Sequence, residues 1–231
     1  MMQTGRLLTA LVLGAALPPL APRLTPPLAA QDLADVCRAM GEAKLGQWTS
    51  YDLTAGRSEG GKMRLAAVGS ERVGDSTFFW FEMHFTGKDP SHDAVIQVLT
   101  PGLGPRGASI HGVIMKAGTQ PAMKLSDAML GVMAQGMSKN NPALEWGKLC
   151  TSATVVGWES ITVPAGTLRA LHIKSDKGDD AWVSRDVPFA IVKVHGQDGT
   201  EFVLTGRGAD ARSSITEKPQ EMSLPGMMPK P

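Results

Sequence analysis

The sequence predicts an α+β protein, mainly antiparallel β, in which about eleven strands form a strongly curved, incomplete β-barrel. Short stretches of alternating apolar and polar residues follow one another through most of the chain, and turn residues such as the Gln-Asp-Gly at 197–199 separate several of them. Only two stretches have the 3.6-residue spacing of a helix. Two helices are too few to cover both faces of so large a sheet, so we expect them to cover its open, concave side.

The first thirty residues have the layout of a secretory signal peptide. One basic residue, Arg6, precedes the apolar run at 7–17, and prolines and small residues follow it. The run is shorter than the roughly 20 residues that span a bilayer. We expect cleavage near Ala30/Gln31 and a periplasmic or secreted protein with no transmembrane segment in its mature chain.

The first predicted helix covers residues 31–44. Asp32 is a suitable residue to cap its start, and Gly46 lies just beyond its end. Its apolar face repeats at helical spacing and consists of Leu33, Val36, Cys37 and Met40.

The second predicted helix covers residues 124–138 and is rich in methionine. Its apolar stripe also has helical spacing and consists of Leu125, Met129, Val132, Met133 and Met137. Methionine is flexible and polarizable, so it suits a surface that adapts to varied apolar partners. Ordinary core packing against the sheet is the alternative interpretation of the same stripe.

Strands are predicted wherever the apolar period changes to two. The clearest strand is residues 76–86, whose apolar face consists of Phe79, Phe81, Met83 and Phe85. The opposite face turns polar, which is typical of a sheet with one dry side. The full set of predicted strands is 47–54, 62–70, 76–86, 93–100, 109–116, 148–156, 159–164, 167–175, 180–185, 189–195 and 201–206.

The two cysteines, Cys37 and Cys150, indicate a disulfide, because an exported protein meets an oxidising environment. Two buried free thiols are the alternative. A bridge would attach the first predicted helix to the body of the protein.

The mature chain is expected to be one domain, residues 31–210, followed by a flexible tail at 211–231 that is polar and rich in proline. The formal net charge of the full chain is +1, and no basic cluster occurs. A nearly neutral chain is a poor match for nucleic acid or for an anionic membrane surface.

No motif indicates catalysis, a cofactor or a metal. The Gly-rich run at 102–107 has the spacing of a dinucleotide fingerprint, but a predicted strand follows it where that fingerprint needs a helix. The five histidines are not paired at metal-ligand spacing, and no G-x-S-x-G sequence occurs. We therefore expect a protein that is not an enzyme and binds neither a cofactor nor a metal.

The C-terminal half resembles a group of bacterial envelope proteins through three motifs. These are the ITVPAG turn at 161–166, the alternating TLRALHIK at 167–174 and the AWVSRDVPFAIVKV segment at 181–194. The run is similar to relatives of the lipoprotein-localisation factors LolA and LolB. That resemblance implies an incomplete, strongly bent antiparallel barrel whose helices close an apolar cavity for acyl chains. No arginine that would lock a lid to the barrel matches by motif.

Together these observations predict a periplasmic, non-enzymatic protein that binds an apolar small molecule or lipid inside the curved sheet. The candidate wall residues are Phe79, Phe81, Met83, Phe85, Leu125, Met129, Val132, Met133 and Met137. One alternative is an interaction module for another envelope protein, with a barrel filled by its own side chains. A second alternative is a hydrolase whose site has no recognisable motif.

Overall fold

The computed structural model describes residues 28–42, 44–55, 60–103, 109–131 and 149–222. The helical elements are α1 (Leu28–Gly41), a short 3-10 helix, η1 (Pro90–His92), and the helical residues 127–131 and 149–152. The strands are β1 (Trp48–Ala55), β2 (Lys62–Val73), β3 (Ser76–Thr86), β4 (Ala94–Thr100), β5 (Gly112–Ala117), β6 (Met123–Leu125), β7 (Thr154–Val163), β8 (Gly166–Lys174), β9 (Asp180–Val183), β10 (Ile191–His195), β11 (Glu201–Gly208) and β12 (Gln220–Met222).

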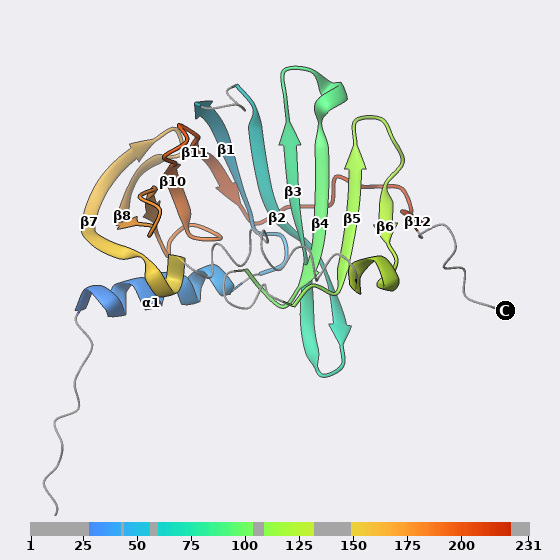
Figure 1. The fold of residues 1–231 in the computed structure, drawn as a ribbon, viewed down its shortest axis with the longest axis horizontal. Coiled ribbons are helices and arrows are strands. Elements are labelled where there is room, and N and C mark those ends of the chain that lie inside the picture. Colours follow the sequence, from blue (N-terminus) through green and yellow to red (C-terminus); the bar gives the residue numbers. More distant parts are fainter. Residues whose placement is uncertain (1–27, 43, 56–59, 104–108, 132–148, 223–231) are drawn as a thin grey trace, which may run out of the picture.

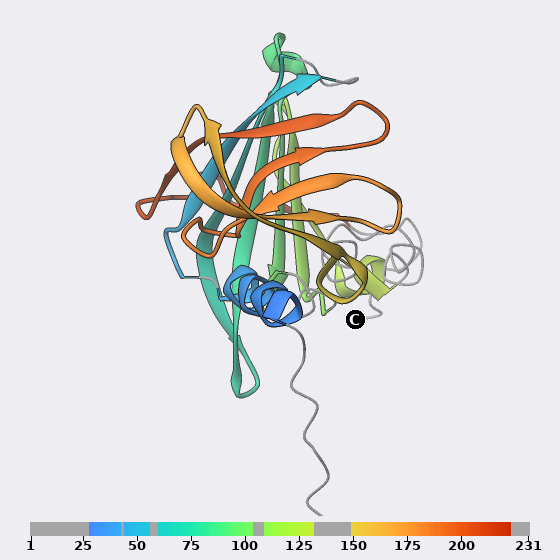
Figure 2. The ribbon, with the colours of Figure 1, turned by 90° about the vertical axis from the view of Figure 1, so that its left-hand side faces the viewer.

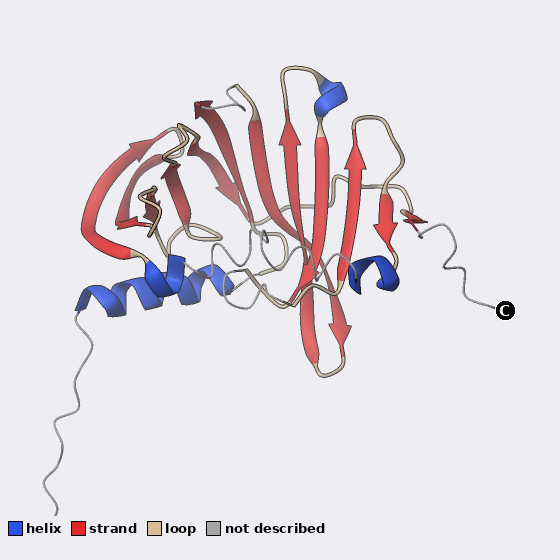
Figure 3. Ribbon diagram, in the orientation of Figure 1, coloured by secondary structure: helices blue, strands red, loops and turns tan. Residues whose placement is uncertain are grey.

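Within the described residues, all the strands belong to one twelve-stranded sheet with the order β12-β6-β5-β4-β3-β2-β1-β11-β10-β9-β8-β7. The sheet curves strongly and does not close (Figures 1 and 3), so β12 and β7 are its two edges. The pairings are antiparallel apart from that of β12 with β6. This architecture confirms the predicted α+β fold with a curved, incomplete barrel.

Most strands lie close to their predicted ranges, but β6 and β12 were not predicted, and the region of β7 differs. Two strands were expected at 148–156 and 159–164, but residues 149–152 are helical and β7 continues without a break from Thr154 to Val163. A bulge lies between Val155 and Gly157, where Gly157 has φ 153°. Glycine accepts this conformation readily, so the strand bends there instead of ending.

Helix α1 lies across one end of the curved sheet (Figure 2). Its buried residues Leu33, Val36 and Met40 form a hydrophobic cluster with Leu171, Ile173, Ala181, Val183 and Ala190. The helix begins at Leu28, ahead of the predicted start, so Asp32 lies inside it and is not its cap. The Asp32 carboxylate instead accepts a hydrogen bond from the indole Nε1 of Trp158 at 2.8 Å.

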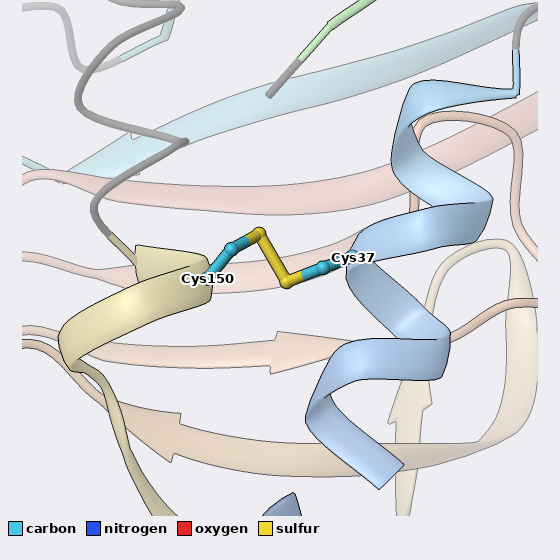
Figure 4. Close-up of a disulfide and its surroundings, with 2 residues drawn as sticks. All are labelled: Cys37 and Cys150. Atoms are coloured by element: carbon cyan, nitrogen blue, oxygen red, sulfur yellow. A yellow bond between two sulfur atoms is a disulfide. The ribbon is translucent and has the colours of Figure 1, made fainter. Parts of the chain in front are cut away.

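The predicted disulfide is confirmed. Cys37 of α1 is bonded to Cys150 in the helical turn that precedes β7, with a Cα–Cα distance of 5.7 Å (Figure 4). The bond joins positions 113 residues apart. It therefore attaches the N-terminal helix to the start of an edge strand.

The second helix starts later than predicted. Residues 127–131 are helical, whereas Leu125 is the last residue of β6, which pairs with both β5 and β12. Ser126 separates the two elements, and its Oγ accepts a hydrogen bond from the backbone N–H of Met129 at 3.4 Å. The remaining predicted positions of this helix, including Val132, Met133 and Met137, lie outside the described residues.

The outer face of β3 is not wet, contrary to the sequence prediction. Phe78 and Trp80 are buried there in a cluster with Val95, Leu99, Ile114, Ala122 and Ile215. Ile215 belongs to the segment that follows β11, which crosses behind the sheet to reach β12 (Figure 1). Residues 211–222, which the sequence assigns to a flexible tail, therefore contact the sheet through Ile215 and β12.

A buried carboxylate fixes this C-terminal segment to the sheet. Glu82 on the outer face of β3 is only 1% exposed. It accepts hydrogen bonds from the Nε2 of Gln97, from the Oγ of Ser213, and from both the backbone N–H and the Oγ of Ser214. The sequence places Glu82 on a solvent face because the covering segment lies far away along the chain.

Candidate functional site

The inner face of β2–β6 carries a row of apolar side chains that crosses all five strands. The register places Met83 of β3 between Leu65 of β2 and Ile96 of β4. Met115 of β5 in turn lies between Ile96 and Met123 of β6. Leu65 is buried, whereas the other members of the row are half-buried and keep apolar surface available for contact.

A second row lies beside the first and is better buried. Its members, from β2 to β5, are Ala67, Phe81, Val98 and Val113. Phe81 packs edge-to-face on Phe189, with ring centroids 6.0 Å apart. The inner face is therefore tightly packed and buried around Phe81, whereas around Met83 and Ile96 its apolar side chains are only half-buried.

The predicted wall residues on β3 do share one face. Phe79 and Met83 are half-buried and pack against the cluster around Phe81. Phe85, also half-buried, lies opposite Ala94 near the end of β3.

Two further wall residues lie near β6. Leu125 follows Met123 by two residues, so it shares the inner face, where it is buried. Met129 is half-buried in the helical residues 127–131. Their contact with a ligand, like that of the β3 residues, stays a prediction.

A strained loop at residues 184–190 lies against this face. Phe189 and Ala190 have φ angles of 61° and 63°, in the left-handed region that residues with a Cβ atom disfavour. Each such residue costs on the order of 1 kcal/mol or more and persists only where its surroundings hold it. Here the contact of Phe189 with Phe81 holds the loop, together with a hydrogen bond from the Ser184 N–H to the Ala190 carbonyl at 2.8 Å.

The other end of the loop borders a polar pocket of about 240 Å³ between α1, β7 and β8. Helix α1 contributes Asp32, Asp35 and Val36, the strands contribute Trp158 and Arg169, and the loop contributes Ser184, Arg185 and Asp186. The pocket contains both signs of charge, so it is suited to a polar or charged group rather than to a hydrocarbon.

Several pocket side chains already have partners. Arg38 forms an ion pair with Asp35 at 3.0 Å, and the carboxylate of Asp32 holds the indole of Trp158. The guanidinium carbon of Arg169 lies 5.0 Å from the centroid of the Trp158 ring. These contacts orient the indole and the guanidinium group of Arg169. None of them pairs the positive charge of Arg169 with a carboxylate.

A polar cluster surrounds Trp182 on β9. The imidazole of His172 stacks on the indole with ring centroids 4.5 Å apart, and its Nε2 lies 2.7 Å from the Oδ1 of Asp180. The indole N–H donates to Glu159, and the Nζ of Lys193 lies 5.6 Å from the ring centroid. In the described ranges, no three His, Cys, Asp or Glu side chains are placed to hold a metal ion.

This cluster predicts an acid-dependent stability. The hydrogen bond with His172 holds the pKa of Asp180 below its ordinary value of 3.8. The hydrogen bond from Lys193 likewise holds the pKa of Glu201 below 4.5. Both carboxyl groups bind protons more readily in the unfolded chain, so their stabilisation is complete above about pH 5 and is lost as the pH falls through the lower folded pKa values.

We expect the melting temperature, followed by circular dichroism, to fall between about pH 5 and pH 3. In Asp180→Asn, the decrease of the melting temperature with falling pH is expected to be smaller. The control Asp176→Asn, at an exposed position, should show the same decrease as the wild type. Equal slopes for Asp180→Asn and the wild type would contradict the assignment.

The sequence did not predict the polar pocket. Its residues come from three separate segments, and their spacing matches no known motif. The Ser-Arg-Asp run at 184–186 belongs to the segment at 181–194 that carries the family resemblance, which assigns it no binding role. The one local signal is a pair of adjacent opposite charges, Arg185 and Asp186, immediately before a bend.

No protein-family model matches the chain, and no curated protein matches it. Two solved structures resemble it: a candidate lipoprotein from Parabacteroides distasonis and a candidate exported protein with a YmcC-like fold from Bacteroides fragilis. The identities are 11% and 10%, with TM-scores of 0.34 and 0.35. Each alignment covers 73% of this chain and 98% of the other. Neither description names a lipoprotein-localisation factor, so that resemblance stays a prediction.

None of the helices in the described part of the chain combines the length and the apolar character needed to cross a membrane.

Proposed function

We propose that this protein is a non-enzymatic protein of the bacterial envelope that binds a lipid or an acyl chain against the inner face of its sheet. The observation that carries this proposal is the row of half-buried apolar side chains formed by Met83, Ile96, Met115 and Met123. The disulfide and the predicted signal peptide support export.

The driving force would be the removal of hydrocarbon from water, about 25 cal/mol for each Å² buried. Three of the four residues in the row are methionines, whose unbranched side chains adjust to the shape of an apolar partner. Such a surface favours a flexible chain over a rigid ligand. The strand register keeps the row continuous, so an extended chain could contact all four residues at once.

The test is a titration of the purified protein with a fluorescent fatty acid, together with native mass spectrometry of protein isolated from the envelope. We expect co-purifying lipid and a saturable titration. The double variant Ile96→Gln/Met115→Gln should weaken binding at least about tenfold, because it places two amides under the chain. Val156→Gln is the matched control, because Val156 is a 57% exposed apolar residue on β7, away from the row.

A wild-type protein that carries no lipid and binds no fatty acid would contradict the proposal. That outcome would favour the alternative of an interaction module whose interior is filled by its own side chains. Equal affinities for the double variant and the wild type would show that binding occurs elsewhere on the molecule.

A further inference from the structure

The polar pocket adjoins the apolar inner face through the loop at 184–190. Ser184, Arg185 and Asp186 line the pocket, and Phe189 of the same loop packs on Phe81 of the inner face. Leu103 also joins the two regions, because it contacts both the α1 cluster and the cluster around Phe81. A ligand with a polar end and an apolar end therefore finds a suitable surface on each side of one loop.

Four charged groups of the pocket make no ion pair within the described residues: the guanidinium groups of Arg169 and Arg185 and the carboxylates of Asp32 and Asp186. The carboxylate of Asp32 is occupied by the indole N–H of Trp158. The backbone of Asp186 is held, since its carbonyl accepts a hydrogen bond from the Nη1 of Arg207 at 2.7 Å and its N–H donates to the Oγ of Ser184. Its side chain and that of Arg185 thus remain available at the rim of a fixed loop.

We propose that this pocket binds the zwitterionic head group of a phospholipid, with the phosphate beside Arg169 and Arg185 and the ammonium group beside Asp186. The acyl chains would then lie on the inner face, so the inference rests on the function proposed above. Arginine matches the geometry of a phosphate group, and a carboxylate matches that of an ammonium group.

The size and the charges of the pocket favour this ligand over others. A volume of about 240 Å³ is below the roughly 300–1,000 Å³ of sites that enclose a whole drug-sized ligand, so the pocket suits a head group alone. A purely cationic ligand would leave both arginines without a partner. A purely anionic ligand would leave Asp186 without one.

The test compares two short-chain lipids by isothermal titration calorimetry: dihexanoyl phosphatidylethanolamine and dihexanoyl phosphatidic acid. We expect Arg185→Gln to weaken the binding of both lipids about tenfold, because both carry the phosphate. Asp186→Asn is expected to weaken only the binding of phosphatidylethanolamine, because only that lipid carries the ammonium group. Arg72→Gln, at an exposed position on β2 outside the pocket, is the matched control.

The outcomes separate this inference from the function proposed above. If both lipids bind the pocket variants and the wild type equally well, the head-group site is wrong and the apolar site stands. The same conclusion follows if the wild type binds the fluorescent fatty acid but neither phospholipid. Free phosphoethanolamine should bind far more weakly than dihexanoyl phosphatidylethanolamine. Equal affinities would overturn the inference that the acyl chains bind the inner face while the head group occupies the pocket. A protein that binds no apolar ligand at all refutes both proposals.

Discussion

Replacing Cys37 and Cys150 together with serine is expected to lower the free energy of unfolding by about 2–5 kcal/mol. The bond closes a long loop, because the two residues are 113 positions apart. In the chain-entropy model, opening such a loop restores much of the freedom of the unfolded chain. The bond also holds α1 next to the start of β7, so α1 is expected to open first when the bond is removed.

Urea denaturation followed by tryptophan fluorescence measures this loss, and hydrogen exchange locates it. The amides of α1 should lose protection well before those of β3 and β4. The sequence contains no other cysteine, so the wild type with dithiothreitol should behave like the double variant, and dithiothreitol should not change the variant. Unchanged denaturation midpoints under reduction would refute a stabilising role for the bond.

Glu82→Ala is expected to destabilise the protein by about 2–4 kcal/mol and to release the C-terminal segment from the outer face. The substitution removes the acceptor of hydrogen bonds from Gln97, Ser213 and Ser214. A hydrogen bond to a charged group contributes about 1.5–3 kcal/mol, and donors left buried without a partner add a desolvation cost. Ile215 then loses its anchor over Phe78 and Trp80.

Limited proteolysis gives a local measure of this release. Trypsin should cleave after Arg212 much faster in Glu82→Ala than in the wild type, under conditions where both proteins remain folded. Glu42→Ala is the control, because Glu42 is exposed and lies at the end of α1. Equal cleavage rates in Glu82→Ala and the wild type would show that the segment is held by β12 and Ile215 alone.

The sequence predicted an individual helix or strand well wherever one pattern of apolar spacing continued over enough residues. The alternation of Phe79, Phe81, Met83 and Phe85 predicted β3 with its observed ends, 76 and 86. Leu33, Val36 and Met40 predicted the buried face of α1, and all three are in its core cluster. The two strands it missed, β6 and β12, have three residues each, which is too short for an alternation to be recognised.

The errors have a common physical origin: segments that are distant along the chain cover or pair with residues whose surroundings local patterns do not reveal. Alternation identifies the two faces of β3, but it does not show what covers the face of Phe78 and Glu82. That depends on Ser214 and Ile215, and Ser214 is 132 residues from Glu82 along the chain. The start of the second helix was wrong for a similar reason, since pairing with β5 and β12 draws the residues before Ser126 into a strand.

Local patterns were sufficient to predict the class of the fold, the positions of most strands, the apolar face of α1 and the pairing of the cysteines. These features follow from local periodicity, turn residues and the count of two thiols. The folded chain was needed to show which faces are dry, how the apolar rows line up across β2–β6, and that Arg169, Arg185 and Asp186 share a pocket with α1. Those features depend on strand register and on contacts between distant segments, which local patterns do not encode.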